Sequence, residues 1–588
     1  MILQSLVKHY EKLLERGEIT KPGWSKVEAS YAIKLSEDGE YRGILPLEET
    51  VQRGKKAVNI PRTFVVPEVT VATSGIRALL LYHNAEYLLG VCLKGKPERT
   101  KQCFEASKEK HLEFLGKIDS PVARAICKYF TNWQIPTEFP DAEKYKKSNF
   151  VFIVNGVYAH EDSAIKQAWD AQYSKESDAP IMQCLVTGER LPIARIHPSI
   201  KRVKDAQQTG AALVSFNSEA YESFGNKKAQ AFNAPVSEYA AFAYTTVLNH
   251  LIADDAHRKF VGDSTVVFWA ETAEPDYGDL FSMMIDPPTE DANEKAAAIM
   301  QKLVKGEPID EKNIDLNVPF YVLGISPNAS RLSVRFFLRD SFGNMLSNLR
   351  EHYHRLEIVK SKLDKREQLP LYLLLKETTN PNSKDDSGSP LLAGSVLRSI
   401  LIGVPYPVAL FTSIMLRVKA TQDSDENDKG GSSKRIAKKI NRTKAAIIKA
   451  YLLKLTNTRI DKEVLSVSLN EESTYIPYVL GRLFSVLENI QEKANPGINA
   501  TIKDRYFNSA CATPSVVFPL LLKLSNSHLR KMEKGASINL KKQVGTLMDK
   551  FSSEKFPKRL TLEEQGTFVL GYYHQTQKRY ESKKQENQ

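Results

Sequence analysis

Continuous apolar runs alternate with stretches of helical spacing through the first 377 residues of the chain. Short runs rich in β-branched and aromatic residues predict strands, whereas apolar residues three and four positions apart predict amphipathic helices. The predicted strands are 77–82, 149–154, 212–215, 265–270, 320–323 and 332–338. The predicted helices are 102–115, 164–173, 237–252, 291–304 and 341–356.

Nearly all of the chain after residue 433 has helical spacing, which predicts helices over 434–455, 475–493, 514–531, 540–551 and 560–584. A mixed region that precedes a helical one indicates an α+β fold, in which a large mixed α/β N-terminal region is followed by a C-terminal α-helical bundle. A chain of 588 residues is too long for one hydrophobic core, so we expect two to four domains.

Two stretches, 378–390 and 420–433, are rich in Asp, Ser, Gly and Asn and have almost nothing to bury. This composition is typical of linkers. We therefore expect three parts. Residues 1–377 form a mixed α+β region with room for two subdomains, 378–433 hold the linkers around a buried helical hairpin, and 434–588 form the helical bundle.

The hairpin is expected in the uncharged run Ser399–Leu416, which is bounded by arginines. A membrane-spanning helix needs about 20 apolar residues, and Pro405 and Pro407 interrupt this run in its middle. Two buried helices that meet at the prolines therefore fit better than a membrane span. The N-terminus also lacks the apolar core of a signal peptide, so we expect a cytoplasmic protein.

The net charge bears on the kind of partner, and the cysteine content bears on the cellular compartment and on structural cross-links. The formal net charge is +12, which is compatible with a polyanionic partner but does not by itself identify one. The five cysteines form no CxxC pair, which argues against a disulfide framework and a structural zinc site and favours a reducing compartment. We expect no cofactor and no bound metal.

The motifs of two large enzyme classes are absent from the sequence. No GxxxxGK[ST] phosphate loop and no GxSxG nucleophile turn occur, so nucleotide hydrolysis and α/β-hydrolase chemistry are excluded. The remaining catalytic hypothesis is a metal-dependent nuclease, because His250, Asp254 and His257 would share one face of a helix. A helix end with solvated charges explains the same residues, and we expect no enzyme.

Single-sign charge marks residues 434–454, which contain eight Lys or Arg and no acid. On one helix, the basic residues cluster on the face opposite Ile436, Ile440, Ile447, Ile448 and Tyr451. A solvated face normally carries both signs, so this pattern favours a helix that contacts phosphates. The predicted contacts are Arg435, Lys438, Lys439, Arg442 and Lys449, with Lys541 and Lys542 farther along.

A second candidate nucleic-acid contact precedes the predicted strand 212–215. It combines positive charge with amide and hydroxyl groups beside a glycine, which allows close approach of a sugar–phosphate strand. A polar turn that enters a buried strand is an equally good interpretation. The residues are Lys201, Arg202, Lys204, Gln207, Gln208, Thr209 and Gly210, with Asn217 at the end of the same stretch.

Several sequence strings in collinear order resemble the large subunit of the type I-C CRISPR Cascade complex, the Csd family. They span nearly the whole chain. In chain order, the strings are TSGI, NAEYLLG, PIMQCLVTGERLPIARIHPSIKRV, AQQTGAALVSFNSEAYESFG, NAPVSEYAAFAYTTVLNHLI, GDSTVVFWAE, GISPNASRLSVRFF, YVLGRLFSVLENIQEKA and INATIKDRYFNSACATPSVVFPLLLKL.

The resemblance implies a non-catalytic subunit of an RNA-guided antiviral complex. Such a subunit helps to recognise the protospacer-adjacent motif (PAM) on double-stranded DNA, promotes duplex opening into an R-loop and steadies the displaced strand. The implied partners are crRNA, the backbone and crRNA-end subunits, a small subunit and a helicase–nuclease. The C-terminal bundle would resemble the small subunit.

Two positions depart from the pattern that the resemblance leads us to expect. Asp205 stands where a glycine is expected, and a carboxylate beside DNA would repel phosphate. His83 stands where an acid is expected before Asn84. The first departure suggests that only the turn before the strand 212–215 is exposed, with the strand as its buried support.

Overall fold

The structure is a computed structural model that divides into two compact units. Unit 1 comprises Met1–Ser199 and Ala212–Asn249, and unit 2 comprises Ile200–Ala211 and His250–Gln588. The three-part division at residues 377 and 433 stays a prediction. The structure describes residues 1–585 except 48, 54–55, 70–74, 93–95, 147, 176–177, 217, 222–229, 288–297, 299–300, 303–304, 308–313, 362–363, 384–387, 424–437, 457–458 and 552–554.

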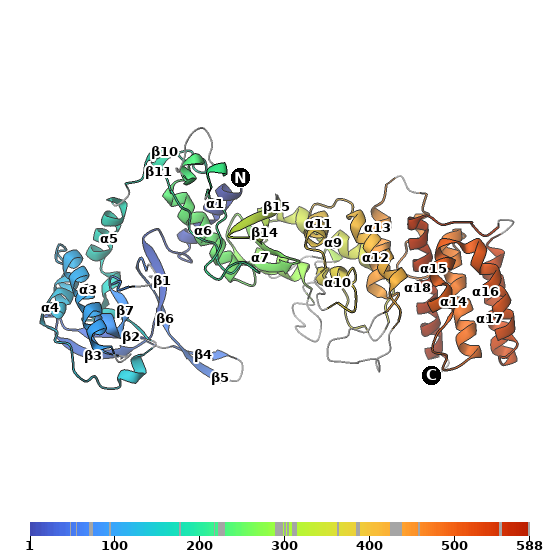
Figure 1. The fold of residues 1–588 in the computed structure, drawn as a ribbon, viewed down its shortest axis with the longest axis horizontal. Coiled ribbons are helices and arrows are strands. Elements are labelled where there is room, and N and C mark those ends of the chain that lie inside the picture. Colours follow the sequence, from blue (N-terminus) through green and yellow to red (C-terminus); the bar gives the residue numbers. More distant parts are fainter. Residues whose placement is uncertain are drawn as a thin grey trace. The chain divides into compact units, whose positions relative to one another are not determined.

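Unit 1 contains a mixed sheet with strand order β3-β2-β8-β7. Its strands β2, β3 and β7 are labelled in Figure 1. Strands β2 and β8 run parallel, and the other pairs are antiparallel. The bounds are β2 Tyr31–Leu35, β3 Tyr41–Pro46, β7 Tyr82–Asn84 and β8 Asn149–Val154, with β9 Val157–Tyr158 paired to β8.

Side chains of this sheet alternate between two cores, as the two-residue period of a strand requires. On β8, Phe150, Phe152 and Val154 pack with α3 (Pro97–Leu115) and α4 (Pro121–Asn132). The intervening residues Val151 and Ile153 pack with the ribbon of β1 (Trp24–Ala29) and β6 (Arg62–Pro67). Both faces are covered, which explains why the strand is apolar throughout.

The remaining elements of unit 1 are shorter or lie outside this sheet. The helices are α1 Ile2–Glu15, α2 Ala85–Leu88, α5 Ser163–Lys175 and α6 Glu238–Ala253, whose final turn is assigned to unit 2. Two further hairpins pair β4 Glu49–Arg53 with β5 Lys56–Ile60 and β10 Ile181–Gln183 with β11 Arg190–Pro192.

Unit 2 begins with a four-stranded antiparallel sheet of order β12-β13-β14-β15. One face of it contributes alternate apolar residues to a large core that also contains α7 (Pro275–Ile285) and α9 (Phe342–Leu356). The strands are β12 Arg258–Val261, β13 Ser264–Ala270, β14 Pro319–Asn328 and β15 Arg331–Ser341.

The same core continues into the helical part of unit 2 without a break. Helix α11 ends before Pro405 and Pro407, helix α12 begins after them, and both helices contribute residues to this core. Among the described residues, no helix combines the length and the apolar character needed to cross a bilayer. The helices are α10 Leu371–Lys376, α11 Pro390–Leu401, α12 Val408–Ala420, α13 Arg442–Lys454, α14 Ile476–Ala494, α15 Ile502–Ala512, α16 Pro514–Leu529, α17 Lys534–Asp549 and α18 Leu562–Gln585.

Helices α14 and α18 approach each other at two glycines. A methyl group on Gly481 of α14 would lie 2.0 Å from the Phe568 carbonyl oxygen, and one on Gly571 of α18 would lie 2.1 Å from the Tyr478 carbonyl oxygen. Neither separation is possible for real atoms, so both positions require glycine at this helix spacing.

The α+β fold class is confirmed, and most predicted elements exist, but several are placed differently. Residues 77–82 do not form a strand: Leu81 has a φ of 63°, and its N–H donates to Nε2 of His111 instead of to a neighbouring strand. Residues 212–215 are not a strand either, because Ala211 makes only an isolated bridge to Ile200 before the chain bends. Most of the predicted helix 291–304 lies outside the described residues.

Replacing Gly481 with alanine should destabilise the C-terminal helices, because α14 and α18 must separate to admit the methyl group. Overpacking of this kind costs about 1–3 kcal/mol. Gly545 of α17 is the matched control, since nothing lies within 4 Å of a methyl group there. Gly545→Ala should raise the melting temperature of the full chain slightly, because alanine favours a helix by up to about 1 kcal/mol. Equal melting temperatures for the two variants would contradict the close approach.

Candidate nucleic-acid interface

The predicted turn at 201–210 forms a closed loop, here called the 200–211 loop. Its two ends, Ile200 and Ala211, are buried and exchange two backbone hydrogen bonds of 2.9 Å each. Val203 is also buried and anchors the middle of the loop. The loop therefore has a fixed base, and its polar residues project from that base.

The sheet of unit 2 holds one side of the 200–211 loop. The Lys204 backbone N–H donates to the hydroxyl of Thr265 on β13 at 3.0 Å, and its Nζ donates to the Gly262 carbonyl at 2.8 Å. Lys204 thus supports the loop through both its backbone and its side chain, and the residue is half-buried. Sequence reasoning placed Lys204 in the interface but gave it no supporting role.

The other predicted contacts of this loop are exposed. They lie on one continuous segment: Lys201, Arg202, Gln207, Gln208 and Thr209 are exposed, and Gly210 is half-buried. Gly210 has a φ of 96°, and its N–H donates to the Gln207 carbonyl at 2.9 Å, which forms the tight turn that presents the amides. Asn217 lies outside the described residues.

The backbone explains why a glycine is expected at position 205. Asp205 has a φ of 60°, in the left-handed region that glycine adopts without strain and that aspartate tolerates better than most residues. The Asp205 side chain is exposed, so its carboxylate shares the surface with the loop's cations. Asp205 therefore preserves the shape of the turn and changes its charge.

Over the described part of the predicted basic helix, residues 438–454, the predicted basic face does not form. Helix α13 begins only at Arg442, where the Asn441 side chain accepts the Lys444 N–H as a cap, and residues Lys444–Leu452 are all buried. A helix that is buried all round presents no solvated face. Arg435 lies outside the described residues.

Two lysines of this segment are buried and held by backbone carbonyl oxygens. Lys439 is 4% exposed, and its Nζ donates to the carbonyls of Lys419 and Thr421 at 3.3 and 3.2 Å. Lys449 is 3% exposed and donates to the carbonyls of Arg355 and Glu357 at 3.2 and 2.6 Å. Burial lowers the pKa of both lysines, that of Lys449 to about 8.

Arg442 and Lys444 pair with acids that lie far away in the sequence. Arg442 donates to Oδ2 of Asp364 at 2.9 Å, and Lys444 forms an ion pair of 3.0 Å with Glu377. A phosphate contact from any of these four cations would require existing bonds to break. The prediction that Lys439, Arg442 and Lys449 contact nucleic acid has no support in the geometry. The absence of acids from the segment reflects partners supplied by other segments.

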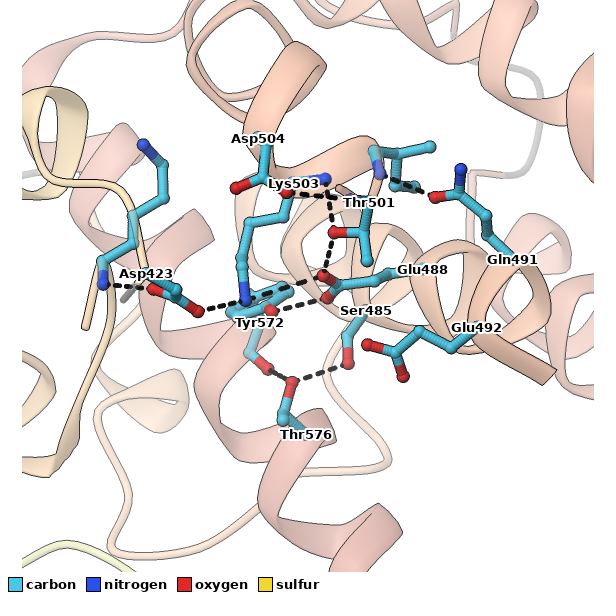
Figure 2. Close-up of polar contacts among 12 residues, drawn as sticks. Asp423, Ser485, Glu488, Gln491, Glu492, Thr501, Lys503, Asp504, Tyr572 and Thr576 are labelled. Carbon is cyan, nitrogen blue, oxygen red and sulfur yellow. Dashed lines mark hydrogen bonds and ion pairs between the residues drawn. The ribbon is translucent and has the colours of Figure 1, made fainter. Parts of the chain in front are cut away.

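A buried charge network lies between α14, α15 and α18, next to this segment (Figure 2). Glu488 is 2% exposed and accepts hydrogen bonds from Tyr572 at 2.5 Å and Thr501 at 2.7 Å, and Lys503 lies 3.7 Å away. Lys503 also pairs with Asp423 at 2.7 Å. Asp423 in turn accepts the Lys439 backbone N–H at 2.6 Å.

The charges in this network compensate one another. Burial by itself would raise the pKa of the Asp423 carboxyl, but Lys503 and the Lys439 N–H hold it below its usual value. Burial would likewise lower the pKa of Lys503, but Glu488 and Asp423 raise it. Both shifts favour the charged forms, so the network is a set of ion pairs.

Three of the basic contacts predicted after residue 433 are at the surface. Lys438 is exposed before α13, and Lys541 and Lys542 are exposed on α17, where Lys534 is exposed as well. Their contact with nucleic acid stays a prediction.

The predicted metal constellation is not assembled. Helix α6 ends at Ala253, so His250, Asp254 and His257 do not share one helical face. Nδ1 of His257 instead lies 3.0 Å from the carbonyl of Phe268, and its Nε2 is 4.0 Å from Asp254. Within the part of the chain that the structure describes, no group of three or more His, Cys, Asp or Glu side chains could hold a metal ion.

The sequence matches a known family over both units. The matching family is described as CRISPR-associated protein (Cas_Csd1), and the match covers residues 6–580. The chain belongs to this family. It is therefore a CRISPR-associated protein, and the family supports a place in a CRISPR effector complex. No curated protein matches the chain.

His83, which stands where an acid is expected before Asn84, makes local hydrogen bonds that explain its place in this Cas_Csd1 protein. His83 accepts the Asn84 N–H at Nδ1, 2.9 Å away, and its Nε2 lies 3.1 Å from the Arg77 carbonyl. Burial lowers the pKa of His83 to about 4, so the ring is neutral at pH 7. Neutral His83 can thus accept the same N–H that a carboxylate would accept.

Sequence reasoning missed the partners of the buried cations. Asp364, Glu377 and Asp423 lie before or within stretches whose composition indicated linkers and loops. An excess of acids in 420–433, set against the excess of bases in 434–454, was the available signal for Asp423, and the residues around Asp364 show no such excess. It cannot specify pairing, because charge complementarity in sequence does not fix which groups meet in space.

Replacing Lys503 with methionine should destabilise the protein, because it leaves the Glu488 and Asp423 carboxylates without their cation. Breaking a buried pair from one side costs about 3–5 kcal/mol. Methionine retains the apolar stem, so the loss reports the charge. Lys542→Met on exposed α17 is the control and should leave the melting temperature of the full chain unchanged. A melting temperature of Lys503→Met equal to that of the control would show that the network contributes nothing.

Proposed function

We propose that this protein is the large, non-catalytic subunit of a type I-C surveillance complex and that it reads a short motif in duplex DNA through the 200–211 loop. The observation that carries the proposal is the loop itself. Its base is fixed by buried residues, while Lys201, Arg202, Gln207, Gln208 and Thr209 are exposed on one short segment. Family membership supplies the context of an RNA-guided complex.

The chemistry of the loop suits contact with a few base pairs. Lysine and arginine neutralise phosphates and so fix the position on the duplex, whereas glutamine can form two hydrogen bonds to an adenine edge. In an RNA-guided complex the guide reads most of the target by base pairing, so the protein needs to read only a short motif. A small, fixed loop is sufficient for that purpose.

Stabilisation of the displaced strand is assigned here to α17 and not to α13. The cations of α13 are occupied by carbonyls and carboxylates, whereas Lys534, Lys541 and Lys542 of α17 are exposed. Exposed lysines contribute to binding by releasing counterions from the nucleic acid. DNA cleavage would be left to a recruited helicase–nuclease.

Loop variants test the assignment in the assembled complex. Lys201→Ala with Arg202→Ala should weaken binding to all duplexes and reduce the slope of log K against log salt by about 2, since about 0.9 is lost per phosphate contact. Gln207→Ala with Gln208→Ala should reduce discrimination between motif-containing and scrambled duplexes by about fivefold to a hundredfold. Fluorescence anisotropy between 50 and 300 mM salt measures both effects. Lys101→Ala, at an exposed position of α3, is the control. Unchanged affinity and discrimination in the loop variants would refute the proposal.

Asp205→Gly tests the charge of the turn separately from its shape. Glycine adopts a φ near 60° without strain and removes the carboxylate, so binding to duplex DNA should become several-fold tighter at low salt, with a smaller gain at high salt. Asp205→Asn is the matched variant, because it keeps a side chain that tolerates this backbone and also removes the charge. Tighter binding by glycine but not by asparagine would assign the effect to backbone strain and not to repulsion.

A further inference from the structure

A small pocket of about 220 Å³ adjoins the 200–211 loop in unit 2. Lys204 belongs to both, because its side chain lines the pocket and bonds to the Gly262 carbonyl at the pocket's edge. Drug-sized ligands occupy sites of about 300–1,000 Å³, so this pocket suits a smaller group.

The pocket has an apolar floor. Four buried residues from three different segments form it, so the floor is part of the core and keeps its shape without a ligand. These residues are Val261, Ile285, Leu371 and Leu375.

Two of the residues that line the pocket are aromatic, and about half of the surface of each is exposed to solvent. Phe260 of β12 is 50% exposed, and Tyr372 of α10 is 48% exposed. The Arg258 guanidinium lies over the Phe260 ring, 4.8 Å from its centroid, which holds one aromatic at a defined position. Exposed aromatics around an apolar floor are typical of a surface that binds a partner, and their faces suit stacking of a planar group.

The charge around the pocket favours an anionic ligand. Among the residues that the structure describes, three lysines line the pocket, Lys204, Lys259 and Lys376, together with one carboxylate, Asp286. Asp286 is 3.8 Å from Nζ of Lys259. A ligand that carries a flat, partly apolar ring beside a negative charge complements this arrangement, and a nucleotide has that composition.

We propose that this pocket binds one unpaired deoxynucleotide of the DNA strand that the 200–211 loop contacts. The base would lie on the apolar floor against Phe260 and Tyr372, and the flanking phosphates would face Lys204, Lys259 and Lys376. The proposal rests on the proposed function, because continuity with the loop through Lys204 is what makes DNA the occupant. It adds a site for an unpaired base beside the contact that reads the duplex.

Photocrosslinking locates the bound base. The full chain is irradiated with a 12-nucleotide single-stranded oligothymidylate that carries one 5-iodouracil, and the crosslinked peptides are identified by mass spectrometry. We expect crosslinks at Phe260 or Tyr372. Tyr372→Ala should weaken binding of the 12-mer by about fivefold to a hundredfold, the range for loss of one stacked base. Tyr372→Phe, which keeps the ring, should bind as the wild type does.

Tyr580 provides the matched control, because it is 53% exposed and lies on α18, away from the pocket lining. Tyr580→Ala should change the affinity for the 12-mer less than twofold. Crosslinks confined to other peptides, or equal affinities for Tyr372→Ala and Tyr580→Ala, would overturn the pocket assignment. Tighter binding of an RNA 12-mer of the same length than of the DNA would overturn the choice of DNA.

Duplex binding separates this proposal from the proposed function. Tyr372→Ala should leave discrimination between motif-containing and scrambled duplexes unchanged, because the Gln207 and Gln208 side chains remain. If the Gln207 and Gln208 substitutions reduce that discrimination but the 12-mer does not crosslink at the pocket, the pocket proposal is wrong and the proposed function stands. If the assembled complex binds neither duplex nor single strand, both fail.

Discussion

Gly481 on α14 and Gly571 on α18 let two helix backbones come into contact, and the arrangement of charges in the C-terminal part of unit 2 follows from that approach. At this spacing Tyr572 of α18 reaches the Glu488 carboxylate of α14, which is thereby taken out of solvent. A buried carboxylate needs a cation and further donors, because the cost of removing a charge from water is several kcal/mol. Lys503 and Thr501 at the start of α15 supply them.

The compensation extends beyond the helix pair. Lys503 is shared with Asp423, which accepts the backbone N–H of Lys439 and so fixes the chain just before α13. Helix α13 itself lies in the core, and its ammonium groups end on carbonyl oxygens. The close approach at Gly481 and Gly571 buries Glu488, and the ion pairs that compensate Glu488 fix the position of the basic segment before α13. In this molecule a run of like charges marks an interior helix.

The sequence predicts individual helices and strands better than the tertiary contacts that those elements make. Strand β8 and helix α14 were identifiable because hydrophobic spacing reflects burial, and the hairpin at Pro405 and Pro407 because proline interrupts a helix wherever it occurs. The run 212–215 was mispredicted because an apolar run becomes a strand only when another strand lies beside it. The nature of α13 was mispredicted because its partners, Asp364 and Glu377, are distant in sequence. In the candidate interface, the loop residues were predicted, but the aromatic and lysine residues of the adjoining pocket were not, since three separate segments assemble it.

The contact between α14 and α18 also constrains the order of events during synthesis. Helix α14 leaves the ribosome well before α18, and at about 5–20 residues per second the delay is on the order of several seconds. Through that interval the groove at Gly481 and the Glu488 carboxylate have no partner from α18, although α15, α16 and α17 are already available to pack. Before α18 has been synthesised, a neighbouring helix can pack into the groove of α14 that α18 occupies in the native structure. This non-native packing is the misfolding route that the topology makes available.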